Sequence, residues 1–252
     1  MFEDRFQGQA AIVTGGGSGI GLAVGSRLAR EGGSVLLADN DEAALARAEA
    51  AMGDVPGRVE TMRADISEEA DVRGLVESAV DRFGGLDVVV NSAGITGETG
   101  TNILDYDLAS FRAVLDVNLI GSFLVTKYAL EAMLPRGYGR ILLLASIAGK
   151  EGNPGMAGYS VSKAGVIGLA KAIGKEYAHT AITVNALAPA LIATPLILGA
   201  AEESLSYMTS RIPMGRLGTV EEAAALACWI VSREASFNTG AVFDLSGGRA
   251  TY

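Results

Sequence analysis

The sequence has little of the side-chain chemistry on which many enzymes depend. Its 252 residues include one cysteine, Cys228, and one histidine, His179. A single cysteine excludes an intrachain disulfide and a cysteine-based metal site, and a single histidine excludes any site that needs two. Cys228 lies in the apolar helical run EEAAALACWIV, which favours a buried, unreactive thiol, whereas His179 is expected at the surface or at a helix end. We therefore predict no metal centre.

The chain also has too little positive charge for some partners. It carries 20 Lys and Arg against 29 Asp and Glu, a formal net charge of −9. Nucleic acids and anionic membranes attract basic surfaces, so neither is expected as a partner. No uncharged apolar run reaches the roughly 18 residues of a membrane span. The first residues, MFEDRFQGQAAIVTGG, lack the basic and apolar parts of a secretory signal. These features lead us to expect a cytoplasmic protein.

With only six prolines and no Pro/Ser-rich linker, the chain is expected to form one domain over 1–252. Short apolar runs alternate with longer helical stretches, which is typical of βα units and a parallel sheet. Strands are predicted at 10–14, 34–38, 58–63, 87–91, 140–145, 182–187 and 241–244. Helices are predicted at 19–31, 42–52, 68–82, 107–134, 158–178 and 219–232. The fold class is therefore α/β: a three-layer, doubly wound parallel sheet of the Rossmann type, with about seven strands and helices on both faces.

One segment interrupts this alternation. Residues 190–218 contain two prolines and several glycines, and a long excursion of this kind in a compact domain is often an active-site lid. A surface loop with a short helix is the alternative interpretation.

A glycine-rich turn follows the first predicted strand. The turn TGGGSGIG occupies residues 14–21 and opens a helix. Glycines let the backbone approach a pyrophosphate, and the helix N-terminus offers unpaired N–H groups to the phosphates. The turn lacks the Lys-Ser/Thr pair of a phosphate-cleaving loop. This context predicts a dinucleotide site.

The second predicted strand ends at Asp39, 18 residues after Gly21. A carboxylate at this position can accept hydrogen bonds from the adenosine ribose hydroxyls and repels a 2′-phosphate. No Arg or Lys adjoins it, and Ser18 stands where a basic residue could meet that phosphate. NAD is therefore predicted in preference to NADP. The alternative role for Asp39 is that of a solvated helix cap.

Tyr159 and Lys163 lie four residues apart in GYSVSK, so they share one face of a predicted helix. A phenol with an ordinary pKa of about 10 is a poor acid or base at neutral pH. A nearby ammonium stabilises the phenolate. Taken alone, such a pair is usually just a solvated helix edge.

The order of several motifs resembles the short-chain dehydrogenase/reductase superfamily over essentially the whole chain. The matching segments are TGGGSGIG at 14–21, ADIS with Asp65, NSAG at 91–94, VNLIGSF with Asn118, ASIAG with Ser146 and ITVNALAP at 182–189. Ser146 precedes Tyr159 by thirteen residues, the usual separation in the family. Departures from the family pattern are Ser92 for a second Asn, Ala190 for a Gly after Pro189, and Ser246 for an Asp.

The resemblance implies a role for each matching residue. Tyr159 would be the general acid or base, Lys163 would bind the nicotinamide ribose and lower the Tyr159 pKa, and Ser146 would hydrogen-bond the substrate oxygen. Asn118 would hold a water that links Lys163 to solvent. The implied cofactor-binding set is Gly15, Gly17, Ser18, Gly19, Ile20, Gly21, Asp39, Asp65, Ile66, Asn91, Ala93, Gly94, Tyr159, Lys163, Pro189, Ile192 and Thr194. The implied substrate set is Ser146, Ile147, Asn153, Tyr159 and Leu191.

The predicted activity is hydride transfer between NAD and a secondary alcohol or its ketone, on a sugar, polyol or small hydroxy compound. One alternative is a 3-oxoacyl-carrier-protein reductase, although Asp39 and the acidic charge weigh against NADPH and an acidic carrier protein. Another is a non-catalytic dinucleotide-binding regulatory protein on the same fold. The resemblance also implies a homotetramer that pairs the helices predicted at 107–134 and 158–178.

Overall fold

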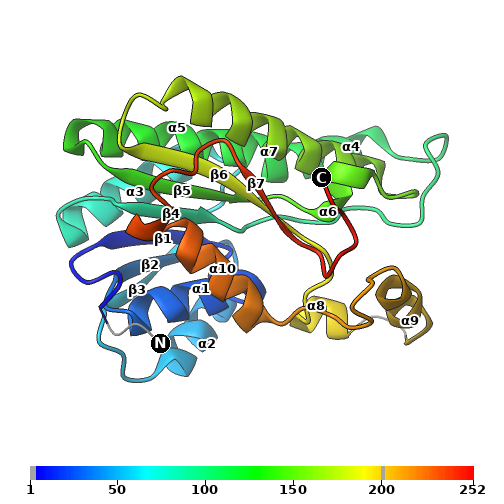
Figure 1. The fold of residues 1–252 in the computed structure, drawn as a ribbon, viewed down its shortest axis with the longest axis horizontal. Helices are drawn as coiled ribbons and strands as arrows, with labels where there is room; N and C mark the ends of the chain where they lie inside the picture. The colour runs from blue at the N-terminus through cyan, green and yellow to red at the C-terminus, as the bar shows by residue number, and fades with distance from the viewer. Residues whose placement is uncertain (1–3, 200–201) are drawn as a thin grey trace.

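Seven parallel strands form one sheet in the computed structural model, which describes residues 4–199 and 202–252 (Figure 1). The strands run in the order β3-β2-β1-β4-β5-β6-β7 across the sheet. Their bounds are β1 Ala10–Thr14, β2 Ser34–Asp39, β3 Val59–Arg63, β4 Val88–Asn91, β5 Gly139–Leu144, β6 Ile182–Pro189 and β7 Val242–Leu245. Each predicted strand is present, with its ends moved by no more than two residues. The predicted α/β class and parallel sheet are confirmed.

The central strands are apolar without alternation because both faces of the sheet are covered there. Ile12 and Leu36 are paired across β1 and β2 and belong to one buried cluster, while Val13 and Leu37 are paired one step along and belong to the other. Successive side chains of a strand point to opposite faces, so burial on both sides requires a continuous apolar run.

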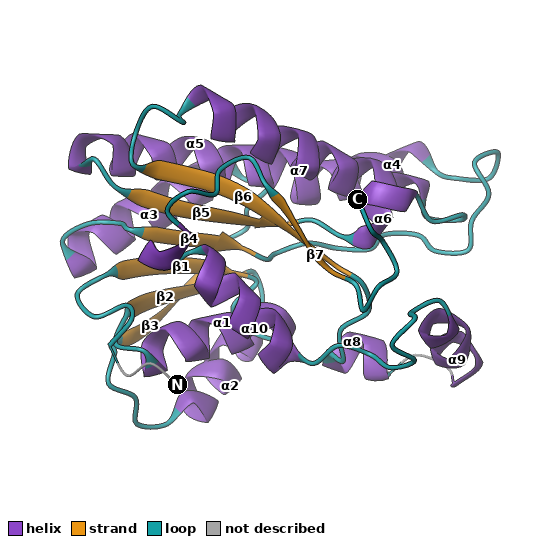
Figure 2. Cartoon of the chain, in the orientation of Figure 1, coloured by secondary structure: helices purple, strands orange, loops and turns teal. Residues whose placement is uncertain are grey.

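Helices cover the two faces of the sheet as two layers (Figure 2). The helices α1 Gly19–Arg30, α2 Glu42–Met52 and α10 Val220–Ile230 contribute to one buried cluster. The other cluster is built by α3 Glu69–Phe83, α5 Gly121–Met133 and α7 Ala157–Glu176. This arrangement is the predicted three-layer, doubly wound fold, and it leaves the carboxyl ends of the strands open for a ligand.

The helix predicted at 107–134 contains an irregular turn in its middle. The α4 helix Leu108–Leu115 continues into a π-helical turn over Asp116–Ile120 and then into α5, followed by a 3-10 turn over Leu134–Arg136. The π turn contains Asn118, and such turns occur often at functional sites. The helical stretch Leu108–Arg136 is long and apolar enough to cross a membrane. The core helix of a globular protein can have the same length and composition. In this fold it packs on α3 and α7.

Two predictions about local structure were incomplete. The short helix α6 Ile147–Glu151 was not predicted, because five residues between Ser146 and a glycine-rich loop show no helical period. Residues 190–218 contain two short helices, α8 Pro195–Leu198 and α9 Glu202–Ser210, which lie beyond the sheet in Figure 1. Ala190 needs no glycine-type backbone, since only glycines among the described residues have a positive φ.

Candidate active site

A crevice opens where the sheet order reverses. The chain leaves β1 toward β2 on one side, and β4 lies on the other side of β1, so the loops after β1 and β4 diverge. A cavity of about 380 Å³ lies at this point. It is lined by residues from the ends of β1, β2, β3 and β4 and from the loop after β6.

Most of the predicted cofactor residues line this cavity. Those at its wall are Gly15, Ser18, Gly19, Ile20, Gly21, Asp39, Asp65, Ile66, Ala93, Gly94 and Thr194. Gly17, Asn91, Tyr159, Lys163, Pro189 and Ile192 lie outside that wall; Asn91 and Ile192 are buried. Ala38, Asn40, Ala64, Ser92, Ile95, Val117 and Pro195 complete the lining. Ala38, Asn40, Ala64 and Ser92 lie at strand ends, whereas Val117 lies in a helical turn and Pro195 begins α8.

The backbone around the glycine-rich turn is packed too closely for side chains at two of its glycines. A Cβ at Gly15 would lie 2.8 Å from the Ala93 nitrogen, and Gly15 also has a φ of 64°. A Cβ at Gly21 would overlap the Gly15 carbonyl oxygen. Ser18 precedes the first residue of α1, yet its side chain makes no capping hydrogen bond. The first N–H groups of α1 therefore remain open to an anion at the positive end of the helix dipole, which fits a dinucleotide pyrophosphate.

Asp39 is held at the mouth of this turn. Its Oδ2 accepts a hydrogen bond from the Gly17 N–H (3.1 Å) and its Oδ1 accepts one from the Asp41 N–H (3.1 Å). The helix cap of α2 is Asp41, whose side chain accepts from the Ala44 N–H. The alternative role of Asp39 as the helix cap is therefore wrong. Its carboxylate is oriented beside the phosphate turn, where ribose hydroxyls could reach it.

Ser146 and Tyr159 come together from neighbouring helices. Ser146 caps α6, its Oγ accepting from the Ala148 N–H (3.2 Å), and it is 8% exposed. Tyr159 lies in the first turn of α7. Burial raises the pKa of the Tyr159 phenol above its usual 10, and a hydrogen bond with Ser146 opposes that rise. The phenol and the hydroxyl are therefore close enough to act on one substrate oxygen.

Lys163 lies one helical turn beyond Tyr159 and is 5% exposed. Its Nζ donates to the Leu144 carbonyl oxygen (2.7 Å) and lies 5.8 Å from the centroid of the Tyr159 ring. Burial lowers the pKa of the Lys163 ammonium to about 8. In this chain alone, burial is the main influence on the phenol pKa and outweighs the hydrogen bond with Ser146. A further positive charge near the phenol would be needed to bring its pKa toward neutrality.

Asn118 uses its side chain fully within the protein. Its Oδ1 accepts from the Ile95 N–H (2.8 Å), and its Nδ2 donates to the Ile95 carbonyl oxygen (2.9 Å) and to Ser162 Oγ (3.0 Å). A Cβ at Gly94 would lie 2.9 Å from Asn118 Oδ1 and 3.3 Å from Lys163 Nζ. Asn118 thus fixes the loop after β4 beside the lysine, and its role in holding a water stays a prediction.

A buried polar chain supports Asn118 from behind. Ser122 Oγ donates to the Asn118 carbonyl oxygen (2.6 Å) and accepts from Asn91 Nδ2 (2.9 Å). Asn91 Oδ1 in turn accepts from Thr14 Oγ1. Sequence reasoning missed Ser122, although its spacing of four residues from Asn118 on one helix could have indicated the contact. Asn91 therefore acts inside the protein rather than at the cavity wall.

The predicted substrate residues differ in their exposure. Ile147 is 3% exposed and packs within α6, so its side chain contributes little open surface. Leu191 and Asn153 are half-buried. Asn153 accepts a hydrogen bond from Arg249 Nη2 (3.0 Å). The structure thus places Ser146, Tyr159 and Asn153 around the joint between α6 and α7.

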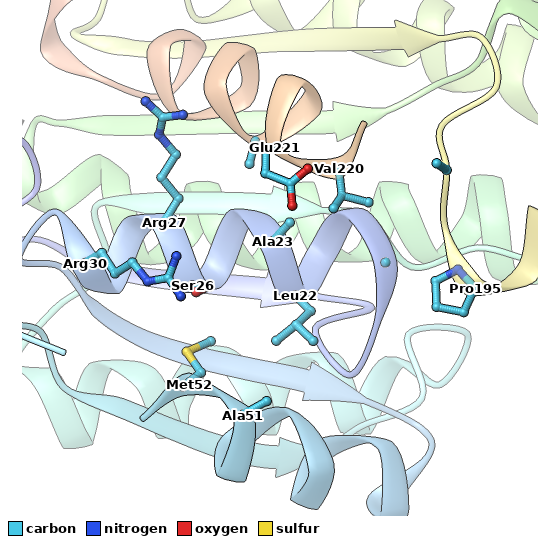
Figure 3. A pocket seen from close by; sticks show the side chains of 13 residues that line it. Leu22, Ala23, Ser26, Arg27, Arg30, Ala51, Met52, Pro195, Val220 and Glu221 are labelled. Carbon is cyan, nitrogen blue, oxygen red and sulfur yellow. The ribbon is translucent and has the colours of Figure 1, made fainter. Parts of the chain in front are cut away.

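A second cavity, of about 440 Å³, lies on the outer side of α1 (Figure 3). Leu22, Ser26 and Arg30 of α1 face it, with Met52 of α2 and Glu221 of α10 at its sides. It contains none of the predicted catalytic side chains. The wall of the crevice at the strand ends does not include those side chains either, but one of its wall residues, Gly94, lies against Asn118 and Lys163, so the chemistry belongs beside that crevice.

No group of three or more His, Cys, Asp or Glu side chains in the described part of the chain could hold a metal ion. Cys228 is fully buried, and burial raises the pKa of its thiol to about 12, as expected for an unreactive cysteine.

The chain is similar to known proteins over nearly its whole length. A family model described as enoyl-(acyl carrier protein) reductase matches residues 15–250. A 2-dehydro-3-deoxy-L-rhamnonate dehydrogenase (NAD(+)) of Sphingomonas sp. (strain SKA58) is 44% identical over all of this chain and 99% of its own. The 3-oxoacyl-[acyl-carrier-protein] reductase of Thermotoga maritima is 36% identical over 97% of this chain and 98% of its own. The solved structure of NAD+-bound xylitol dehydrogenase matches with a TM-score of 0.92 at 32% identity, covering 97% of this chain and 100% of that chain.

A doubly wound sheet with a glycine-rich phosphate turn and a Ser-Tyr-Lys set defines a nicotinamide-dependent oxidoreductase. The chain belongs to the short-chain dehydrogenase/reductase superfamily. Its relatives confirm the predicted superfamily, the activity class acting on CH–OH groups, and NAD as the cofactor.

Proposed function

We propose that the protein is an NAD-dependent dehydrogenase of a hydroxylated sugar acid, and that it interconverts a secondary alcohol of this substrate and its ketone. The observation that carries the proposal is the pairing of Ser146 with Tyr159, beside Lys163 and an Asp39-bearing cofactor cavity. The sugar-acid class is supported by the Sphingomonas relative, which matches over its whole length.

The side chains have complementary tasks in this reaction. When bound, the nicotinamide accepts or delivers the hydride, and its oxidised form adds positive charge near the phenol. Ser146 Oγ holds the substrate oxygen, and the Tyr159 oxygen takes the hydroxyl proton during oxidation or returns it during reduction. Lys163, charged below about pH 8, favours the phenolate and offers donors to ribose hydroxyls.

The second candidate function is reduction of a 3-oxoacyl chain on a carrier protein, supported by the Thermotoga relative. Two features weigh against it. Asp39 places a negative charge where the 2′-phosphate of NADPH would bind, and the net charge of −9 disfavours docking of an acidic carrier protein. A non-catalytic dinucleotide-binding role is disfavoured by the complete set of Asn118, Ser146, Tyr159 and Lys163.

A panel of substrates with both cofactors tests the proposal. Purified protein would be incubated with sugar acids, polyols, cyclic alcohols and a 3-oxoacyl thioester, with NAD(H) or NADP(H), and absorbance of the reduced nicotinamide would be followed. We expect sugar acids with NAD to give the highest kcat/KM. A preference for the thioester with NADPH would favour the second candidate, and no activity with any pair would leave the regulatory role.

Three accompanying features complete the proposal. Residues 190–218, with α8 and α9, serve as a lid over the substrate. The protein works in the cytoplasm. It assembles as a homotetramer. The assembly is supported by exposed apolar side chains on the long helix and on α7: Ile120 is 45%, Phe123 48% and Val161 49% exposed. A second copy covering these helices would bury them. Sedimentation equilibrium should give four times the 25.9 kDa chain mass; a monomer would contradict the assembly.

A further inference from the structure

The last residues of the chain fold back over the joint between the two catalytic helices. After β7, the Ser246 side chain is buried (2% exposed). Its Oγ donates a hydrogen bond to Asp244 Oδ1 and accepts one from the Ala250 N–H (3.0 Å). Glycines 247 and 248, with φ values of 62° and 88°, allow the reversal. Figure 1 shows the C-terminus beside α6. We call residues 246–252 the C-terminal strap.

Four polar contacts fasten this region to residues 150–153. Lys150 Nζ pairs with Asp244 Oδ2 (2.8 Å), and the Tyr252 hydroxyl donates to the Lys150 carbonyl oxygen. Arg249 Nε donates to Glu151 Oε2 (2.9 Å), and its Nη2 donates to Asn153 Oδ1 (3.0 Å). The Arg249 side chain is only 10% exposed and that of Lys150 only 5%. These ion pairs are therefore screened by water far less than pairs between exposed side chains.

The partners of Arg249 lie on either side of Gly152, in the segment between Ser146 and Tyr159. Glu151 is the last residue of α6, which begins directly after Ser146. Asn153 follows Gly152. Gly152 has a φ of 73°, and no atom lies within 4 Å of the point where its Cβ would be. The Asn153 N–H donates to Ser160 Oγ (3.0 Å), the residue next to Tyr159. Arg249 thus holds the end of α6 and the Asn153 side chain by two hydrogen bonds, and a third, from the Asn153 N–H to Ser160, continues the link to the start of α7.

We propose that Arg249 is a positioning residue that fixes the substrate side of the active site, so that the C-terminal strap sets how the substrate is aligned between Ser146 and Tyr159. The inference rests on the proposed function for its kinetic consequence. None of the strap residues lines the cofactor cavity, so we expect the strap to act on the substrate and to leave NAD binding unchanged. Small displacements of positioned groups cost large factors in rate, since a shift of about 1 Å can cost about 100-fold.

The test compares Arg249→Met, Arg249→Lys and the charge-reversed pair Arg249→Glu with Glu151→Arg. Arg82→Met is the matched control, because Arg82 also pairs with a glutamate, Glu60 (2.7 Å), on β3 at the opposite edge of the sheet. We expect Arg249→Met to raise KM for the alcohol at least tenfold with the NAD dissociation constant unchanged. Arg249→Lys should show a smaller rise, the reversed pair should recover part of the loss, and the control should match the wild type.

Hydrogen exchange provides a readout that needs no substrate. Amides of residues 150–156 should exchange faster in Arg249→Met than in the wild type, and the control should show no change there. An unchanged KM together with unchanged exchange would overturn the proposal. So would an equal loss of NAD affinity and substrate affinity in Arg249→Lys, which would indicate a general structural role. If the wild type oxidises no alcohol, the proposed function fails, and the exchange measurement still decides whether Arg249 holds the joint.

Discussion

Replacing the buried Lys163 by methionine is expected to stabilise the fold while it removes activity. Burial lowers the pKa of this ammonium from 10.5 to about 8. At 1.36 kcal/mol per pKa unit, this lowering corresponds to roughly 3 kcal/mol of penalty on the charged form. Methionine loses the hydrogen bond to the Leu144 carbonyl oxygen, which costs about 1 kcal/mol. Lys163→Met should therefore gain roughly 2 kcal/mol in unfolding free energy at pH 7.

The gain should shrink as pH rises. The folded pKa lies below the unfolded value, so the penalty is complete below about pH 8 and is lost progressively between about 8 and 10.5. At pH 9.5 roughly half of the burial penalty remains. Removing this smaller penalty is nearly offset by the loss of the hydrogen bond, so the variant should be about as stable as the wild type. The lysine is thus a case in which a functional group is kept at the expense of stability.

Thermal unfolding without NAD measures this directly. A gain of roughly 2 kcal/mol corresponds to a Tm increase of about 4–8 °C for a chain of this size at pH 7. Lys171→Met, an exposed lysine on the same helix, should leave Tm nearly unchanged. A Lys163→Met variant with an equal or lower Tm at pH 7, or with a gain that does not fall with pH, would refute the burial argument.

Three other substitutions test the cofactor cradle and its support. Gly21→Ala places a Cβ against the Gly15 carbonyl oxygen, so NADH affinity measured by fluorescence should fall at least about tenfold, whereas Gly74→Ala, in open space on α3, should leave binding intact. Asp39→Ala removes the charge facing a 2′-phosphate, and the ratio of kcat/KM for NAD over NADP should drop at least about tenfold; an unchanged ratio would contradict the role of Asp39. Ser122→Ala removes two buried hydrogen bonds, to the Asn118 carbonyl oxygen and from Asn91 Nδ2, and denaturant unfolding should show a loss of about 2 kcal/mol.

The sheet and its layers could be predicted from the sequence because both depend on local patterns. Runs such as AAIVT and SVLLA are apolar on both faces, and only a covered parallel sheet accommodates them. The glycine-rich turn and Asp39 were found because their chemistry requires them at fixed positions after strands. Ser146 and Tyr159 were predicted from the order of the family motifs, because the residues around them do not by themselves indicate a catalytic role.

Contacts made across the chain could not be predicted in this way. Ser122 accepts a hydrogen bond from Asn91, 31 residues away, and no local pattern indicates that these two side chains meet. Arg249 meets Glu151 from 98 residues away, and nothing in DLSGGRATY shows that it returns to α6. The sequence also suggested that Lys163 lowers the Tyr159 pKa, whereas burial raises it in the chain alone. Burial depends on the complete fold, so its effect on the Tyr159 pKa can be seen only in the structure.

The central claim is that the Tyr159 hydroxyl transfers the proton while NAD takes up the hydride. The most direct test is the rate of NADH formation by the wild type and Tyr159→Phe on the best alcohol of the panel, with NADH binding measured for both. The account predicts that kcat falls by about 10²–10⁴ while NADH affinity is retained, since only the proton-transferring group is removed. A Tyr159→Phe variant that keeps most of its activity would contradict it.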